Sequence, residues 1–90
     1  MKRFKQYQKT GVLAVDMVAR CKDHFAARFR TVKEVYLRPD LWKQFTEYVK
    51  RQDEEIDTKE AIDFDDTLVK CGSLVGNNPM IYYLNPQADA

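Results

Sequence analysis

In this 90-residue chain, two aspartates separated by one residue have the type and spacing that best suit catalysis. They are Asp63 and Asp65, and Thr67 follows at the same spacing. Two carboxylates directed at one point suit nucleophilic attack combined with acid–base catalysis. Alternate side chains of an extended segment lie on one face, so these carboxylates meet at a common site only where a strand end bends.

The string Asp-Phe-Asp-Asp-Thr-Leu at residues 63–68 resembles the first motif of the haloacid-dehalogenase phosphatases. The resemblance covers six residues and implies a magnesium site that accepts a phosphoryl group. It also implies that Asp63 is the nucleophile, that Asp65 is the acid and base, and that Thr67 contacts the phosphate.

The surroundings of this motif favour a structural role instead. In that family a buried strand precedes the motif near the start of a large parallel α/β domain, whereas polar residues dominate positions 58–61 here. Only twenty-three residues follow Thr67, too few for the crossover helices that a parallel sheet needs. We interpret Asp65–Asp66 as a turn between two short strands and expect no enzymatic activity, with phosphoryl transfer as a remote alternative.

No other pattern in the chain indicates a catalytic, metal or cofactor site. His24 is the one histidine, and its helical neighbours Arg20 and Arg28 are cations that supply no orienting carboxylate. Cys21 and Cys71 are fifty positions apart without a CxxC motif, so we expect two buried thiols rather than a zinc site or a redox pair. We predict no cofactor, no metal and no small-molecule substrate.

The first element that the sequence predicts is a helix from Thr10, where Thr10 or Gly11 serves as the cap. Its predicted core face is a row of apolar residues at every fourth position, namely Leu13, Met17, Cys21, Phe25 and Phe29, widened by Ala14 and Val18. A second row is expected to be solvated and to contain an ion pair between its first two members: Asp16, Arg20, His24 and Arg28.

The remaining elements alternate between strand and helix signals. A β-favouring run over Thr31–Arg38 predicts a strand that ends before Pro39, and Pro39 suits the first turn of a second helix. This helix should bury one face, formed by Leu41, Trp42, Phe45, Tyr48 and Val49. After an acidic linker the hydrophobic period changes toward two, which predicts strands near residues 62–64, 67–71 and 80–84.

This element order predicts an α+β fold in which two helices pack on a small antiparallel sheet with a C-terminal hairpin. We divide the chain into a basic arm (1–10), a single small α+β domain (11–86) and a flexible tail (87–90). The apolar stretches are too short for a membrane-spanning helix, so we expect a cytoplasmic protein without a membrane partner.

The charge of the chain divides into two opposed blocks. Residues 1–33 hold nine Lys and Arg against two acids, a net charge of +7, whereas residues 34–90 hold six against twelve, a net charge of −6. Such asymmetry can steer a partner or a second subunit into place. The basic block also interleaves cations with aromatics, as in Arg3-Phe4-Lys5, a pattern that suits contacts with nucleic-acid phosphates and bases.

Residues 64–72 and 79–83 resemble the short hairpin segments of small bacteriophage accessory or virion-associated proteins. The resemblance implies a chain that docks into an assembly, in the host cytoplasm or in the virion. Tyr82 and Tyr83 are adjacent on the last predicted strand and so point to opposite faces. That strand is uncharged, and at a sheet edge it would invite addition of a partner strand.

We therefore predict a non-enzymatic interaction or assembly protein that binds a protein partner or a second copy of itself. The binding residues are expected in the basic N-terminal third and on the exposed strand: Lys2, Arg3, Phe4, Lys5, Arg20, Arg28, Arg30, Tyr82 and Tyr83. The alternative is a nucleic-acid-binding protein that uses the basic arm and the arginines of the first helix.

Overall fold

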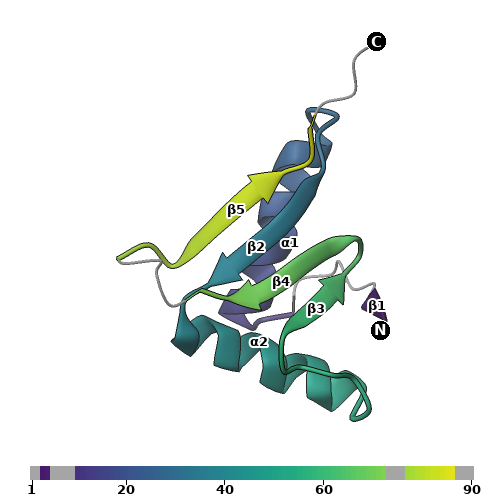
Figure 1. Ribbon diagram of the computed structural model, residues 1–90, viewed down its shortest axis with the longest axis vertical. Coiled ribbons are helices and arrows are strands. Elements are labelled where there is room, and N and C mark those ends of the chain that lie inside the picture. The colour runs from purple at the N-terminus through teal and green to yellow at the C-terminus, as the bar shows by residue number, and fades with distance from the viewer. Residues whose placement is uncertain (1–2, 5–9, 73–76, 87–90) are drawn as a thin grey trace.

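The fold is a five-stranded sheet with both helices on one face (Figure 1). The computed structural model describes residues 3–4, 10–72 and 77–86. Along the chain the elements are β1 (Arg3–Phe4), α1 (Leu13–Ala26), β2 (Val32–Leu37), α2 (Pro39–Gln52), β3 (Ala61–Phe64), β4 (Thr67–Cys71) and β5 (Met80–Leu84). The strand order across the sheet is β1-β3-β4-β2-β5.

The α+β class is confirmed, but the sheet is mixed instead of antiparallel. β2 pairs in parallel with β4 and antiparallel with β5, and β1 pairs in parallel with β3. The tight hairpin of the C-terminal half joins β3 to β4. β4 and β5 are not neighbours, because β2 lies between them. The predicted arm contributes β1, and the predicted tail lies outside the described residues.

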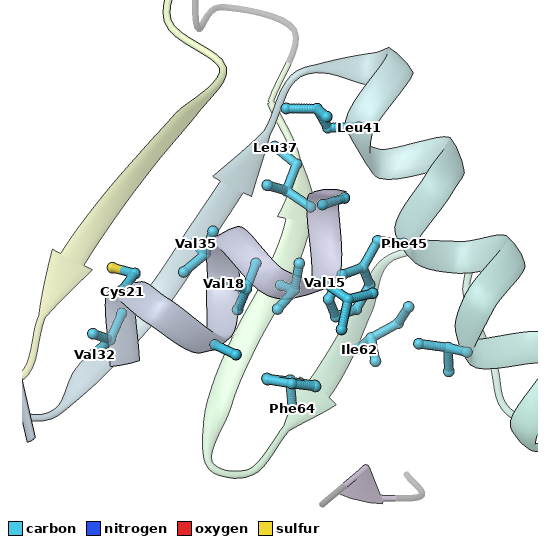
Figure 2. Packing of buried hydrophobic residues seen from close by; sticks show 14 of the residues in the cluster. Val15, Val18, Cys21, Val32, Val35, Leu37, Leu41, Phe45, Ile62 and Phe64 are labelled. Carbon is cyan, nitrogen blue, oxygen red and sulfur yellow. The ribbon is translucent and has the colours of Figure 1, made fainter. Parts of the chain in front are cut away.

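The hydrophobic core lies between the helices and the covered face of the sheet (Figure 2). β2 contributes Val32, Val35 and Leu37, all almost completely buried. Residues 32 and 35 are three positions apart, and a register shift between Val32 and Glu34 opposite β5 returns both to the same face. Across the core, Phe45 of α2 meets Phe64 of β3 edge to face, with ring centroids 5.5 Å apart.

The start of α1 is held by a buried carboxylate. The helix begins at Leu13, later than predicted, and Val12 occupies the cap position without a side-chain hydrogen bond. Asp16 was expected in the solvated row, but it is only 9% exposed. Its carboxylate accepts the N–H groups of Thr10 (2.8 Å) and Gly11 (3.1 Å) and the Thr10 hydroxyl (2.9 Å). Gly11 has φ +82°, a conformation that favours glycine.

The buried face of α1 is rotated from the predicted one. Its buried apolar residues are Ala14, Val15, Val18, Ala19 and Cys21. By contrast, Leu13 is 57% exposed and Phe29, beyond the helix end, is 96% exposed. A step of four residues advances about 400° around a helix, so a row at every fourth position drifts by about 40° per step. The predicted row therefore leaves the core face at both ends.

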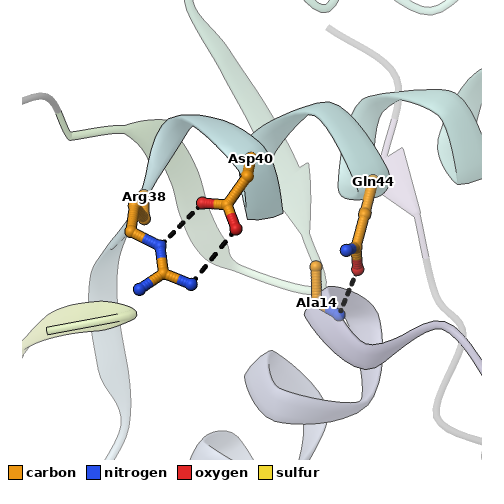
Figure 3. A network of polar contacts seen from close by, with 4 residues as sticks. All are labelled: Ala14, Arg38, Asp40 and Gln44. Atoms are coloured by element: carbon orange, nitrogen blue, oxygen red, sulfur yellow. Dashed lines mark hydrogen bonds and ion pairs between the residues drawn. The ribbon is translucent and has the colours of Figure 1, made fainter.

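α2 follows its prediction closely and is tied to its neighbours by polar contacts (Figure 3). It begins at Pro39 and buries Leu41, Phe45 and Val49. Just before it, Arg38 donates from Nε and Nη2 to the two carboxylate oxygens of Asp40, at 2.7 and 3.1 Å. These hydrogen bonds lower the pKa of Asp40. The Ala14 N–H at the start of α1 donates to Gln44 Oε1 of α2 at 3.4 Å.

We expect Asp16→Ala to lower the free energy of unfolding by about 2 kcal/mol, because the turn before α1 loses a buried, charged acceptor. Urea denaturation followed by circular dichroism measures this loss. Asp23→Ala removes an exposed carboxylate from the same helix and is the matched control, with an expected change below about 0.5 kcal/mol. Equal losses in the two variants would contradict the role given to Asp16.

Candidate functional site

Asp65 and Asp66 of the carboxylate motif form a two-residue turn, and Asp63 and Thr67 on either side of it are hydrogen-bonded within the fold. Asp65 and Asp66 have positive φ values of 51° and 71°, as a tight turn between β3 and β4 requires. Asp63 accepts the Asp66 N–H at 2.8 Å. Thr67 is fully buried, and its hydroxyl donates to the Val32 carbonyl and accepts from Lys22 Nζ, both at 2.7 Å. The predicted turn is confirmed, and Thr67 faces the interior.

The other chemistry-bearing side chains are dispersed. Within residues 3–4, 10–72 and 77–86, no three His, Cys, Asp or Glu residues cluster closely enough to hold a metal ion. Both cysteines are free thiols. Cys21 is buried, which raises the pKa of its thiol, whereas Cys71 is exposed at the end of β4. The prediction of two buried thiols is therefore wrong for Cys71, because β4 emerges from the core at its last residue.

The two edges of the sheet differ in length and lie far apart in the strand order. β1 has two residues and forms the edge beside β3, whereas the five uncharged residues of β5 form the edge beside β2 (Figure 1). The predicted binding residues Arg3 and Phe4 thus lie at the edge opposite Tyr82 and Tyr83. The structure does not bring these two groups together. Lys2 and Lys5 lie outside the described residues.

The hydrogen-bond pattern of β5 directs alternate backbone groups away from the sheet. The Arg38 N–H donates to the Pro79 carbonyl at 3.0 Å, so residue 79 faces β2. Backbone groups alternate in direction along an antiparallel strand, so the N–H and C=O groups of Met80 and Tyr82 point outward. Among the described residues, β5 pairs with β2 alone. Within the part of the chain that the structure describes, β5 therefore presents a free backbone edge.

A shallow, open groove runs beside this edge, on the side of the sheet that carries the helices, and we call it the α1–β5 groove. Its volume is about 520 Å³. Its apolar lining comes from both elements: Met17, Cys21, Phe25, Met80 and Tyr82. The rings of Phe25 and Tyr82 meet with centroids 5.1 Å apart. Met17, Cys21 and Phe25 of α1 thus form one wall of the groove, and Met80 and Tyr82 of β5 form the other.

The helix rim of the α1–β5 groove is basic. Arg20 and His24 complete the lining, and no acidic residue is among the described residues that line it. Arg28 adjoins the rim, because its Nη1 donates to the His24 carbonyl at 2.9 Å and contacts Nδ1 of the same residue at 3.4 Å. The row predicted to be solvated began with Asp16. Because Asp16 is turned inward, the exposed residues of that row are Arg20, His24 and Arg28, which are all basic.

The structure separates Arg30 and Tyr83 from this groove. Arg30 donates to the Asn85 carbonyl at 3.3 Å and lines a second hollow of about 480 Å³ together with Lys22 and Asp65. The lining of this second hollow contains side chains of both charges. Tyr83 lies on the uncovered face of the sheet, where its ring meets Tyr36 with centroids 5.8 Å apart. Among the predicted binding residues that the structure describes, Arg20, Arg28 and Tyr82 are brought together.

Sequence reasoning missed five residues of the groove. Met17, Cys21 and Phe25 were assigned to the core face of the helix, His24 was assigned to the solvated row, and Met80 was not identified as a binding residue. The groove residues of α1 could have been found from the drift of an every-fourth-residue row around the helix. This drift places part of the row at the margin of the core. A strand outside that margin then completes a groove.

The uncovered face of the sheet carries a polar cluster whose charges are paired. Glu34 Oε2 accepts the Tyr36 hydroxyl at 2.8 Å and Lys70 Nζ at 2.9 Å. The hydrogen bond from Lys70 lowers the pKa of Glu34, and the same bond raises the pKa of Lys70. Because these charges neutralise one another, this face offers a charged partner less than the groove rim does.

The turn after α1 holds an exposed aromatic residue in a strained conformation. Phe29 has φ 58°, a left-handed backbone that bulky residues disfavour. The N–H groups of Phe29 and Arg30 donate to the carbonyls of Ala26 (3.0 Å) and Phe25 (2.9 Å), a helix ending that normally places glycine where Phe29 stands. The fold therefore gains little from this side chain, which is exposed to solvent.

Comparison with protein-family models, curated protein sequences and solved structures found no match. In the described part of the chain, no helix is both long enough and apolar enough to span a membrane. The geometry of the groove and of the β5 edge is therefore the basis on which we assign a function.

Phe29→Gly is expected to raise the free energy of unfolding by about 1 kcal/mol, because glycine adopts the left-handed conformation without a Cβ clash. Ala27→Gly, two residues earlier at a right-handed position, should lower it by roughly 0.5 to 1 kcal/mol. Urea denaturation of both variants gives the comparison. If Phe29→Gly instead destabilised the protein, the ring would have to contribute contacts that its exposure does not indicate.

Proposed function

We propose that this protein is a non-enzymatic docking module that binds an extended segment of a protein partner along the free edge of β5. The observation that carries the proposal is the combination of an uncharged edge strand with an apolar groove beside it. In strand addition, the edge supplies backbone hydrogen bonds and the adjoining groove receives alternate side chains. The outward groups of Met80 and Tyr82 and the α1–β5 groove supply both.

Charge favours a segment of another protein over a second copy of this chain. If the β5 strands of two copies paired antiparallel in one continuous sheet, both α1 helices would lie on the same face of it. The cationic Arg20 and Arg28 side chains of the two rims would then face each other, and like charges repel. Self-association through β5 is therefore the competing outcome of the test below.

The nucleic-acid alternative is supported less well by the same geometry. Binding along a phosphate backbone needs cations gathered on one surface. Arg20 and Arg28 lie at the groove, whereas Arg30 is bonded to the Asn85 carbonyl beside a hollow that also contains acids. Binding of nucleic acid stays a prediction, as does the role in a phage assembly that the resemblance of residues 64–72 and 79–83 implies.

Proline substitution tests strand addition directly. A display library of random ten-residue peptides supplies binders, and fluorescence anisotropy measures their affinity for purified protein. We expect Tyr82→Pro to weaken binding by about tenfold or more, because proline removes the outward N–H of residue 82 but no hydrogen bond to β2. Tyr82→Ala keeps that N–H and should weaken binding less.

Folding of these variants is checked by urea denaturation. Ile81→Pro removes an N–H that faces β2, so it should cost more stability than Tyr82→Pro. Full binding of the selected peptides by Tyr82→Pro would contradict the proposal. A wild-type dimer in analytical ultracentrifugation that Tyr82→Pro converts to a monomer would replace the proposed partner with a second copy.

A further inference from the structure

We infer, on the basis of the proposed function, that the partner segment carries alternating apolar side chains and a carboxylate that binds Arg20 and His24 at the rim of the α1–β5 groove. The inference rests on three features of that groove: the direction in which an added strand points its side chains, the chemistry of the walls, and a rim whose described lining residues include Arg20 and His24 but no acid.

The direction of the guest side chains follows from the pairing of β-strands. Residues directly opposite each other on neighbouring strands place their side chains on the same face of a sheet. The side chains of Met80 and Tyr82 line the groove, on the face that the helices cover. Guest residues opposite these two positions therefore point into the groove, and the guest residue between them points to the uncovered face.

The walls of the groove suit apolar guest side chains of several shapes. Met17 and Phe25 of α1 are half-buried, so part of each apolar surface remains in contact with solvent. Met17 and Met80 have flexible, unbranched side chains, which adapt to differently shaped neighbours. The apolar walls should therefore accept leucine, isoleucine, methionine or phenylalanine, which leaves the rim to discriminate among sequences.

The rim favours a carboxylate in the same row of the guest. Arg20 and His24 are exposed, and no acid is among the described residues that line the groove. A guanidinium binds a carboxylate through two parallel hydrogen bonds, which fixes the position as well as the charge of the guest group. The carboxylate can belong to an aspartate or glutamate side chain or to the C-terminus of the guest chain.

The experiment uses the peptides that the display library yields. Each peptide is made with an amidated and with a free C-terminus, and each acid of the groove-facing row is replaced by its amide. We expect enriched peptides to share apolar residues at alternate positions, and loss of the carboxylate to weaken binding about fivefold. Arg20→Gln should cause a similar loss with the acidic peptide and little loss with the amide peptide.

Arg51→Gln removes an exposed arginine from α2, away from the groove lining, and serves as the matched control. It should leave the affinity for every peptide unchanged. If peptides bind and Tyr82→Pro abolishes binding, but acid and amide peptides bind equally well, the docking function stands and the carboxylate inference is overturned. Peptides enriched without alternating apolar residues would also overturn it. Equal losses with Arg20→Gln and Arg51→Gln would show general charge attraction instead of a contact at the rim.

Discussion

The burial of β2 is the constraint on which the rest of the structure depends. β2 is hydrogen-bonded on both sides, to β4 in parallel and to β5 in antiparallel orientation, and both helices contact it. Its inward side chains Val32, Val35 and Leu37 are almost completely buried. A strand placed in this way determines where the helices lie. They centre on β2 and β4, so β5 remains at the margin of the core.

This placement explains why apolar side chains are exposed where the groove lies. A helix about 10 Å in diameter covers roughly two strands that are about 4.8 Å apart, so one helix centred near β2 covers its outer neighbour incompletely. Phe25 of α1 and Met80 of β5 are accordingly only half-buried, and Tyr82 is 42% exposed. Just beyond the same end of α1 lies Phe29, which combines a strained backbone with an exposed side chain.

Local signals in the sequence predicted most of the elements, and long-range contacts account for what they missed. The β-favouring run before Pro39, the period of two after residue 60 and the Asp65–Asp66 turn each act over a few residues, and each predicted its element correctly. The parallel pairing of β2 with β4 joins segments more than thirty residues apart, and no local pattern specifies it.

The same reasoning applies to the candidate site. Arg20 and Tyr82 were predicted as binding residues from separate patterns, whereas the groove that joins them required knowing that β5 lies beside α1. The inward position of Asp16 was missed because its hydrogen-bond partners, Thr10 and Gly11, were expected to cap the helix, whereas they belong to a turn that precedes it. Without that buried acid, the rim is more basic than the sequence pattern indicated.

The unequal sheet edges have a further consequence for how the protein behaves when it is alone. The edge formed by β1 is two residues long, which limits its use as a template, whereas β5 offers five uncharged residues. Natural sheets commonly protect such edges with lysine or proline, because unprotected edges allow molecules to stack into aggregates. The proline nearest to β5 is Pro79, which lies just before the strand and not within it. A bound partner segment would therefore also act as a solubilising cover, and high concentrations without it would promote precipitation.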